Sequence, residues 1–374
     1  MRIFLDGHFL DGQKHGVAVY LLSLYTDLVI ARPDISLFVG LEKGSDVSAP
    51  LYNNPNVKKL YYDRGGWLRF LFDIPILVSK IQPDVVHTQN AIPVFRKPGV
   101  DYHVTLFDVL YEDYPMYFGL RYRLSRSILF KFAARESNIL STCSDYSAKR
   151  IRAHYLRGRR FVGKLIHVIP PGIALNESDS IEATSPFSFK FLLYVSRFEI
   201  RKNHLMLVEA FNKVSQEHPE LKLVLVGFEI DGSLAETRAL VDKLSISRSV
   251  VFESNIPQSR LLALYKSAEL VVYPSRCEGF GMPILESMLV NPRLIFSNTS
   301  SMSDFGFASE CFMESYSSEA IANKVMESLA YPSLIEGRYE TRKKFIREHY
   351  LWSHSGELLS QLYSLSKIDF TQRS

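Results

Sequence analysis

Residues 270–286 read LVVYPSRCEGFGMPILE, and this stretch predicts a buried strand, a glycine-containing turn and the start of a helix. The strand is expected from Leu270 to Tyr273, because a short apolar run suits a parallel sheet that is covered on both faces. The helix is expected to begin near Pro283, since proline is pre-set for the first helical turn and its missing N–H is not needed there. A strand, a turn and a helix in this order are the unit from which α/β folds are built.

The turn of this stretch carries two carboxylates and an expected anion site. Glu278 is predicted in the loop, and Glu286 on the first turn of the helix. The backbone N–H groups of Gly281 and Met282 lie between them at the positive end of the helix, where an anion such as phosphate is bound favourably. Two carboxylates beside an anion site suit a ligand with both hydroxyls and phosphates, and a nucleotide-sugar is such a ligand.

Residues 274–286 closely resemble the Glu-x7-Glu signature of the retaining glycosyltransferases of family 4. Those enzymes have the GT-B fold, an α/β architecture of two Rossmann-like domains with parallel sheets that face each other across a cleft. The resemblance implies that Glu278 binds hydroxyls of the donor sugar and that Glu286 binds the ribose hydroxyls. The loop residues that it assigns to donor binding are Gly279, Phe280, Gly281 and Met282. The alternative is an ordinary strand-turn-helix with solvated glutamates, since short motifs often match by chance.

A second block, residues 193–204 with the sequence LYVSRFEIRKNH, places two cations after another predicted strand. Arg197 offers a forked donor for phosphate oxygens, and Lys202 offers a mobile point charge. The family has an Arg and a Lys at matching places, which implies that both bind the diphosphate of the donor. The alternative is a solvated basic loop, which is what most Arg-Lys pairs are.

Two weaker signals lie in the first half of the chain. The loop that ends at Gly16 resembles the family's glycine-containing loop near the donor phosphate and the acceptor, although an ordinary first turn looks the same. After a later strand the family often has His-Asp, and the matching positions here are Phe107 and Asp108. Because the side chain of Phe107 forms no hydrogen bond, we assign that place to Asp108 or to the backbone carbonyl of Phe107.

Short apolar strands alternate with helical stretches in both halves of the chain, as in doubly wound parallel sheets. Besides a first strand at the N-terminus, the predicted strands are 85–87, 103–107, 139–143, 166–169, 191–195, 221–226, 250–252, 270–273 and 293–296. Residues 170–186 are rich in Pro, Ser, Asp and Glu and predict a linker. We therefore predict an N-terminal, acceptor-side domain of residues 1–172 and a nucleotide-sugar-binding domain of residues 173–350. The resemblance implies that a last helix, 351–374, packs back on the first domain; the alternative is a plain core helix.

The composition is that of a globular protein without covalent cross-links. The chain has 374 residues, of which 47% are hydrophobic and 22% are charged, and this length suits two ordinary domains. Three widely spaced cysteines, Cys143, Cys277 and Cys311, argue against a disulfide framework or a zinc site and fit a reducing compartment. No apolar run approaches the roughly 18 residues of a membrane-spanning helix, and the N-terminus does not read as a signal peptide. We therefore expect a cytoplasmic protein.

Neither a metal nor a cofactor is expected. No Asp-x-Asp and no cluster of His, Cys and Asp with metal-ligand spacing occurs in the chain. Without a divalent ion, the leaving diphosphate must be neutralised by Arg197, Lys202 and the helix N-terminus near Met282. The family's usual mechanism, in which the leaving phosphate assists the acceptor hydroxyl on the same face and configuration is retained, is implied by the resemblance.

Positive charge is concentrated in one segment of the first half. Residues 119–164 contain twelve Lys or Arg but only two acidic residues, a balance of +10, while the whole chain carries +4. Within this segment apolar residues interleave with Arg121, Arg123, Arg126 and Lys131, as in a basic helix at a membrane surface. We expect peripheral contact with the anionic inner face of the membrane rather than with nucleic acid, because no nucleic-acid module is visible. The alternative is a core helix with a solvated basic face.

These features together predict a metal-independent retaining glycosyltransferase. It would transfer a hexose from a nucleotide-sugar, GDP-mannose before a UDP-hexose, to a hydroxyl of a glycan or lipid-linked glycan. Assembly of bacterial surface polysaccharide, such as O-antigen, lipopolysaccharide or capsule, is the expected setting. The alternatives are a sugar-nucleotide epimerase or a phosphorylase on the same fold, and a catalytically silent subunit of a transferase complex, which Phe107 favours.

Overall fold

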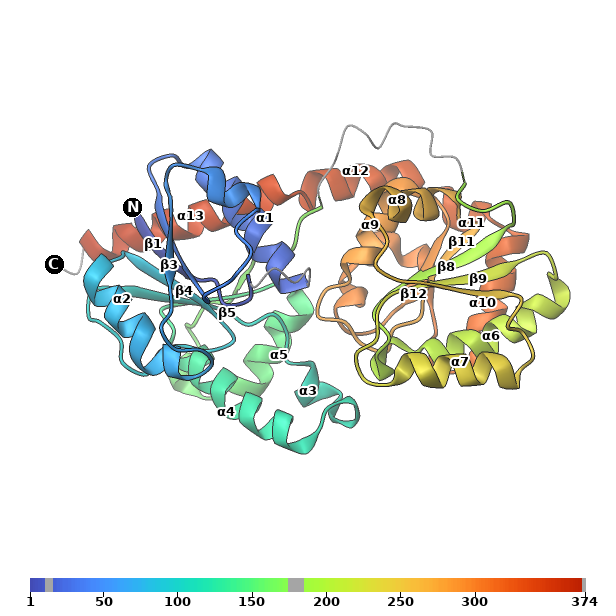
Figure 1. Cartoon of the computed structure of the whole chain (residues 1–374), viewed down its shortest axis with the longest axis horizontal. Coiled ribbons are helices and arrows are strands. Elements are labelled where there is room, and N and C mark those ends of the chain that lie inside the picture. The colour runs from blue at the N-terminus through green and yellow to red at the C-terminus, as the bar shows by residue number, and fades with distance from the viewer. Residues whose placement is uncertain (11–15, 174–184, 372–374) are drawn as a thin grey trace. The chain divides into compact units, whose positions relative to one another are not determined.

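The computed structural model describes residues 1–10, 16–173 and 185–371, and for residues 366–371 it describes the backbone alone. The chain forms two compact units (Figure 1). The first consists of Met1–Ala174 and Tyr350–Ser374, and the second of Leu175–His349. The first unit therefore includes the last helix of the chain as well as its N-terminal half.

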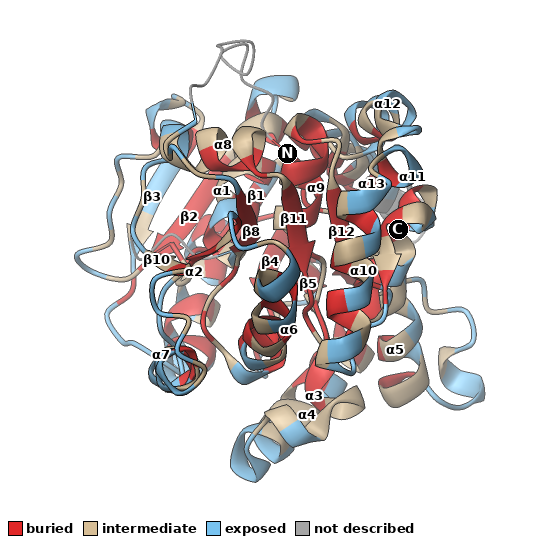
Figure 2. Cartoon of the chain, turned by 90° about the vertical axis from the view of Figure 1, so that its right-hand side faces the viewer, coloured by how far each residue is buried: buried red, intermediate tan, exposed pale blue. Residues whose placement is uncertain are grey.

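The described residues of the first unit form seven parallel strands in the order β3-β2-β1-β4-β5-β6-β7. These strands are β1 (Arg2–Asp6), β2 (Ser36–Leu41), β3 (Val57–Tyr61), β4 (Val85–Gln89), β5 (Asp101–Thr105), β6 (Ile139–Thr142) and β7 (His167–Val168). The longer helices are α1 (Gly16–Ala31), α2 (Ile74–Ile81), α4 (Leu120–Glu136), α5 (Asp145–Tyr155) and α13 (Trp352–Thr371). The π-helical turn η2 (Arg69–Asp73) directly precedes α2, and α3 (Leu110–Asp113) is a single turn. The central strands β1, β4 and β5 are buried in Figure 2, because helices cover both faces of the sheet, whereas the edge strand β3 is mostly exposed.

In the second unit, the part that the structure describes, residues 185–349, forms six parallel strands in the order β10-β9-β8-β11-β12-β13. They are β8 (Phe191–Val195), β9 (Lys222–Val226), β10 (Val250–Glu253), β11 (Leu270–Tyr273), β12 (Leu294–Ser297) and β13 (Phe312–Met313). The helices are α6 (His204–Glu217), α7 (Ser233–Lys243), α8 (Gln258–Ser267), α9 (Met282–Val290), α10 (Ser318–Ala330), α11 (Ser333–Glu336) and α12 (Tyr339–His349). Every strand predicted from the sequence is present with ends within two residues of the prediction, whereas β2, β3 and β13 were not predicted.

The strand order fixes where a ligand is expected in each sheet. The chain reverses direction across the first sheet between β1 and β4, and across the second sheet between β8 and β11. In open parallel sheets, ligands bind outside the carboxyl ends of the strands at this switch point. The loops that follow β8 and β11 are the two blocks that the sequence singled out.

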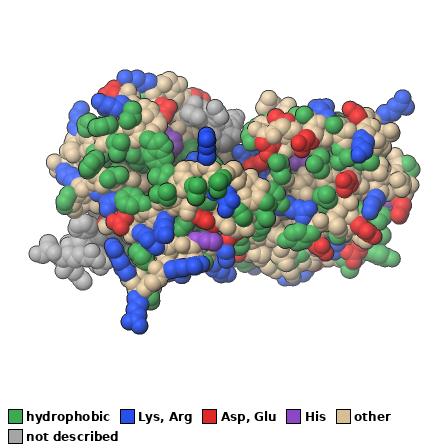
Figure 3. Space-filling view, turned by 90° about the horizontal axis from the view of Figure 1, so that it is seen from below, with side chains coloured by type: hydrophobic (Ala, Val, Ile, Leu, Met, Phe, Trp, Pro, Cys, Tyr) green, Lys and Arg blue, Asp and Glu red, His purple; other side chains and the backbone are tan. Residues whose placement is uncertain are grey.

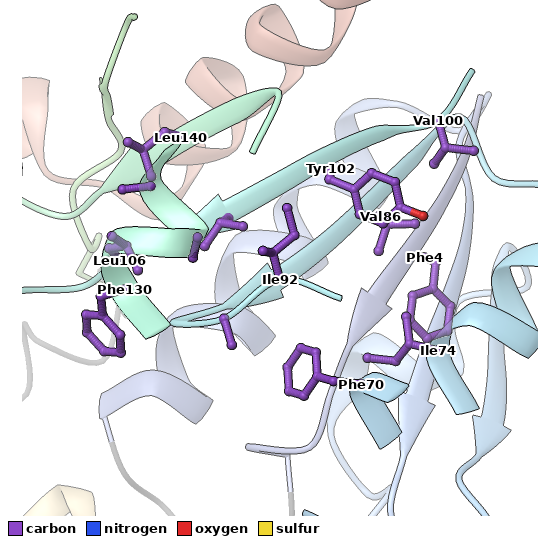
Figure 4. Close-up of a cluster of buried hydrophobic side chains, with 14 of the residues drawn as sticks. Phe4, Phe70, Ile74, Val86, Ile92, Val100, Tyr102, Leu106, Phe130 and Leu140 are labelled. Carbon is purple, nitrogen blue, oxygen red and sulfur yellow. The ribbon is translucent and has the colours of Figure 1, made fainter. Parts of the chain in front are cut away.

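One hydrophobic cluster fills the first unit on one face of its sheet (Figure 4). Phe70 and Ile74 from η2 and α2 and Phe130 from α4 all pack in it, against strand residues such as Phe4 and Val86. The helices α2 and α4 therefore cover the same face of the sheet.

Inside the same unit, six buried polar side chains form a closed ring of hydrogen bonds. They come from α1, α13 and three neighbouring strands, and in ring order they are Tyr25, His87, Thr105, Ser141, His103 and Tyr363. The six distances between hydrogen-bonding atoms lie between 2.6 and 3.0 Å. Burial lowers the pKa of His87 to about 3 and also lowers that of His103, so both imidazoles are neutral. The ring ties α13 to the centre of the first sheet.

Candidate active site at the switch point of the second sheet

The loop after β11 carries Glu278, whose carboxylate is buried among three polar partners. Lys202 Nζ donates to Glu278 Oε1 at 2.6 Å and to Oε2 at 2.7 Å. Arg201 Nη1 donates to Oε2 at 3.3 Å, and the hydroxyl of Tyr273 donates to Oε1 at 3.1 Å. Both cations come from the turn after β8, so the two strands at the switch point bring the two sequence blocks together as an ion-pair cluster.

This surrounding keeps Glu278 ionised. Burial alone would raise the pKa of its carboxyl, but the charges of Lys202 and Arg201 lower it to about 2. The backbone is held as well, since Glu278 N–H donates to Ser300 Oγ at 2.8 Å and Ser301 Oγ donates to the Glu278 carbonyl at 2.8 Å. A fixed carboxylate of this kind accepts hydrogen bonds from hydroxyl groups in a defined direction.

The two remaining charged residues of the β8 turn are more accessible. Arg197 has 41% of its side chain exposed and lies 3.5 Å from Glu199 Oε2. Glu199 also accepts from Arg201 Nε at 3.0 Å. Among the described residues of this site, three cations, Arg197, Arg201 and Lys202, therefore face two carboxylates, Glu199 and Glu278. The local excess of one positive charge favours an anionic ligand.

The helix α9 begins where the sequence predicted, with Pro283 in its first turn. Gly281 precedes it with φ of +104°, a conformation that side-chain-bearing residues rarely adopt, and an added Cβ would lie 3.2 Å from Ile284 Cδ1. The N-terminal N–H groups of α9, which start at Met282, point back towards the loop of Glu278. Gly279 and Phe280 belong to this loop, and the carbonyl of Phe280 accepts from Ser301 Oγ at 3.1 Å.

Glu286 lies one residue further along α9 than predicted. It is the fifth residue of the helix and so belongs to the second turn, because the helix starts one residue before Pro283. Its side chain is half-buried, and its Oε2 accepts from the hydroxyl of Tyr265 on α8 at 3.4 Å. Burial raises the pKa of this carboxyl, in contrast to that of Glu278.

The two site residues predicted in the first unit lie at the carboxyl edge of its own sheet. Gly16 is the first described residue of α1, and nothing lies within 4 Å of a Cβ added there. The carboxylate of Asp108 accepts from the N–H of Leu110 at 3.1 Å at the start of α3. The carbonyl of Phe107, the other group assigned to this place, already accepts from Cys143 Sγ at 2.9 Å.

Sequence reasoning missed Arg201 and Tyr273, which complete the surrounding of Glu278. Arg201 was visible as a second cation next to Lys202, but its burial (9% exposed) has no signal in the sequence. The predicted linker, residues 170–186, follows β7 and lies mostly outside the described residues.

Residues 178–352 match the protein family described as Glycosyl transferases group 1. Among curated proteins, the chain is 28% identical over 149 residues to D-inositol 3-phosphate glycosyltransferase of Corynebacterium jeikeium, an alignment that covers 36% of each chain. It is 29% identical over 142 residues to O-antigen chain mannosyltransferase B of Escherichia coli, covering 37% of this chain and 36% of that protein. The chain thus aligns with about a third of the length of these two relatives.

Among solved structures, the chain is similar to sucrose-phosphate synthase from Thermosynechococcus elongatus, with a TM-score of 0.80 and 18% identity. The similarity covers 99% of this chain and 100% of that one. This likeness shows the fold, so the expected α/β architecture of two Rossmann-like domains with parallel sheets, the GT-B fold, is confirmed.

Proposed function

Because residues 178–352 match the family Glycosyl transferases group 1, we propose that the chain is a retaining hexosyltransferase. It transfers a hexose from a nucleotide-sugar to a hydroxyl of a glycan or lipid-linked glycan. The observation that carries this proposal is the cluster of Glu278, Lys202 and Arg201 at the switch point of the second sheet, beside the N-terminus of α9. A carboxylate for sugar hydroxyls and an excess of positive charge for phosphates are both present there.

The donor diphosphate is bound by Arg197, Lys202 and the N-terminus of α9. A phosphate that reaches Lys202 competes with Glu278 for its ammonium group. Arg201, which also contacts Glu278, keeps that carboxylate paired when Lys202 turns to the phosphate. Glu278 is then available to the donor sugar, while Glu286, one turn along α9, binds the ribose hydroxyls.

The chemical step depends on fixed charges. As the bond between the sugar and the diphosphate breaks, negative charge grows on the leaving group, and preorganised cations and N–H groups stabilise it. Arg197 and Lys202 supply that stabilisation without a divalent ion. Asp108 and Gly16 remain our assignments for the acceptor side and the donor phosphate in the first unit.

Mannose is the favoured sugar, and GDP-mannose the favoured donor before a UDP-hexose. The similarity to an O-antigen chain mannosyltransferase supports this choice, and it supports a place in the assembly of bacterial surface polysaccharide. The acceptor is then a growing glycan, which in such assembly is carried by a lipid.

Residues 119–164 provide peripheral contact with an anionic membrane. On α4, Leu120, Leu124 and Ile128 are 65%, 58% and 70% exposed at helical spacing, beside basic residues of the same helix. This arrangement supports an amphipathic helix at a lipid surface. Among the described residues, no helix has both the length and the apolar character needed to cross a bilayer.

The test is a screen of the purified chain against nucleotide-sugars, with and without vesicles that carry a lipid-linked glycan. We expect one donor to release its nucleoside diphosphate slowly in water and faster with acceptor. Isomerisation of the sugar without lasting release would identify an epimerase, and a requirement for inorganic phosphate a phosphorylase. A folded chain that binds no nucleotide-sugar would be a silent subunit.

A further inference from the structure

Residues 67–76 of the first unit, WLRFLFDIPI, combine buried charged side chains with exposed apolar ones. The charged side chains of this segment, Arg69 and Asp73, are buried. Five of its seven large apolar side chains are exposed, and we call these five the apolar stripe: Trp67 (53% exposed), Leu68 (50%), Leu71 (38%), Phe72 (47%) and Ile76 (58%). The other two, Phe70 and Ile74, are buried. Contiguous exposed apolar side chains of this kind mark a surface that meets a partner.

The buried charges fix the stripe in its outward position. Arg69 Nη2 lies 3.3 Å from Oδ2 of the buried Asp6, and Arg64 donates through its N–H and its Nη1 to Asp73, each at 2.7 Å. Between them Phe70 packs into the hydrophobic cluster (Figure 4). Turning the helix to hide the stripe would separate Arg69 from Asp6 and Asp73 from Arg64, and breaking a buried ion pair is costly. The exposure is therefore a stable property of the fold.

The apolar stripe lies on the same side of the first unit as α4. Both α2 and α4 pack on one hydrophobic cluster, so their outer sides belong to one surface. In the view of Figure 3, apolar and basic side chains gather together on the first unit. Both segments follow the carboxyl ends of strands, η2 after β3 and α4 after β5, and so lie near the edge where ligands of such sheets bind.

Charge decides which partner fits this surface. The segment 119–164, which includes α4, has a balance of +10, so a partner must be anionic to be attracted. A second copy of the chain would bring the same positive charge against it. A bilayer with anionic headgroups offers negative charge at its surface and an apolar layer beneath, and Trp is favoured at that boundary.

We propose that the apolar stripe inserts into the boundary between headgroups and acyl chains of an anionic membrane, while the basic residues of α4 bind the headgroups. From this membrane a lipid-linked acceptor would reach the first sheet. Only this last point rests on the proposed function; the membrane contact itself does not. The proposal assigns the apolar contact to a segment outside residues 119–164.

The chain contains its own probe for this insertion. It has two tryptophans, of which Trp67 is in the stripe and Trp352 is buried at 8% exposure. In a Trp352→Phe variant, Trp67 alone reports the stripe. With vesicles of phosphatidylglycerol, we expect its emission to shift to the blue, to be quenched by brominated acyl chains and to be shielded from iodide. Phosphatidylcholine vesicles should have little effect.

Matched variants distinguish binding through the apolar stripe from nonspecific adsorption to vesicles. In the wild-type chain, Leu71→Ser with Phe72→Ser should weaken binding to phosphatidylglycerol vesicles by about tenfold or more. Ile30→Ser is the control, because Ile30 is 67% exposed on α1, a helix that contributes nothing to the cluster under α2 and α4. Nucleotide-sugar hydrolysis in solution should be unchanged in both variants. Vesicle binding therefore tests membrane insertion, and hydrolysis separately tests the proposed function.

Three results would overturn the proposal. Trp67 emission that stays unchanged on vesicles that do sediment with the chain would leave α4 as the only contact. Emission of a buried indole in the free chain would mean that the stripe is already covered. A dimer in sedimentation velocity that Leu71→Ser with Phe72→Ser abolishes would make the stripe a self-association surface.

Discussion

The two units each bury a polar network, and the networks differ in how their charges balance. In the first unit, the ring of Tyr25, His87, Thr105, Ser141, His103 and Tyr363 is neutral, and each member bonds to two others. In the second unit, three cations face two carboxylates around Glu278. A neutral, fully paired network stabilises a fold and needs nothing further. A cluster with an excess of positive charge favours an anionic ligand, and this contrast supports our proposal that the second network is the functional one.

Acidification should break the neutral ring and give the largest effect. The pKa of His87 is lowered to about 3 in the folded chain, and that of His103 is also lowered, mainly by burial. The unfolded chain therefore binds more protons below pH of about 6.5, and stability falls as pH decreases, by up to about 1.4 kcal/mol per pH unit for each imidazole. Denaturant unfolding between pH 7 and 5, followed by tryptophan fluorescence, measures this. Both tryptophans lie in the first unit.

The nearby carboxylate of Asp6 acts against this shift by favouring protonated His87, but burial outweighs it. Between pH 6.5 and 5 the effect of the imidazoles on stability can be measured apart from that of Glu278. A carboxylate whose pKa is lowered in the folded chain loses its contribution to stability only as the pH falls below its pKa in the unfolded chain, near 4.5. Equal stability at pH 7 and pH 5 would mean that the ring tolerates an additional proton.

Removing one cation from the charged cluster should act on turnover. Lys202→Met or Arg197→Met is expected to lower kcat by roughly 10²–10³, as for the loss of another group that stabilises developing charge. Lys190→Met is the matched control, since Lys190 is 64% exposed and pairs with Glu269 at 3.7 Å. Steady-state release of nucleoside diphosphate provides the measurement. A kcat for Lys202→Met equal to that of the control would remove Lys202 from the site.

Removing one hydroxyl from the neutral ring should act on stability alone. Tyr363→Phe leaves Tyr25 and His103 each without one buried partner, which costs about 1–3 kcal/mol of unfolding free energy. Tyr331→Phe is the control, because Tyr331 is 63% exposed. Nucleoside diphosphate affinity, measured by calorimetry, should be the same in both variants. A loss of affinity in Tyr363→Phe alone would contradict the structural role of the ring.

The two glutamates should separate sugar from nucleotide. Glu286→Ala removes the proposed partner of the ribose hydroxyls and should weaken binding of the free nucleoside diphosphate by about 1–3 kcal/mol. Glu278→Gln should leave that affinity unchanged or higher, because Lys202 loses its competing carboxylate, while turnover of the donor falls. Calorimetry with the nucleoside diphosphate distinguishes them. The reverse pattern would show that the two roles have been exchanged.

A chelator should have the smallest effect. If fixed cations stabilise the leaving diphosphate, EDTA leaves kcat unchanged in a chain that has been dialysed against it. Activity that disappears with EDTA and returns with magnesium would show that the excess charge of the cluster is not sufficient by itself.

Local signals in the sequence predicted much of the fold. Pro283 and the apolar run from Leu270 to Tyr273 determine their structures through short-range preferences, and the structure has the helix and strand there. Glu286 lies one residue further along α9 than predicted, because the ends of helices vary by a residue or two. Arg201 was passed over since burial depends on what packs above a residue.

The polar ring in the first unit shows what local sequence signals do not predict. Its members are spread from Tyr25 to Tyr363, and each looks ordinary in its own stretch of sequence. Pairing between distant segments has no local signature, and only the assembled sheet brings these side chains together.

The ring also links the tautomers of its two histidines. Two neutral imidazoles and four hydroxyls supply six hydrogens for six bonds, so all donors must point the same way round. In one direction His87 carries its hydrogen on Nε2 and His103 on Nδ1; in the other direction both are exchanged. The two imidazoles are therefore always opposite tautomers, and they change places only when all six hydrogens move together. Nitrogen chemical shifts of the two rings would report this as a single two-state equilibrium, a proton-order switch inside the first unit.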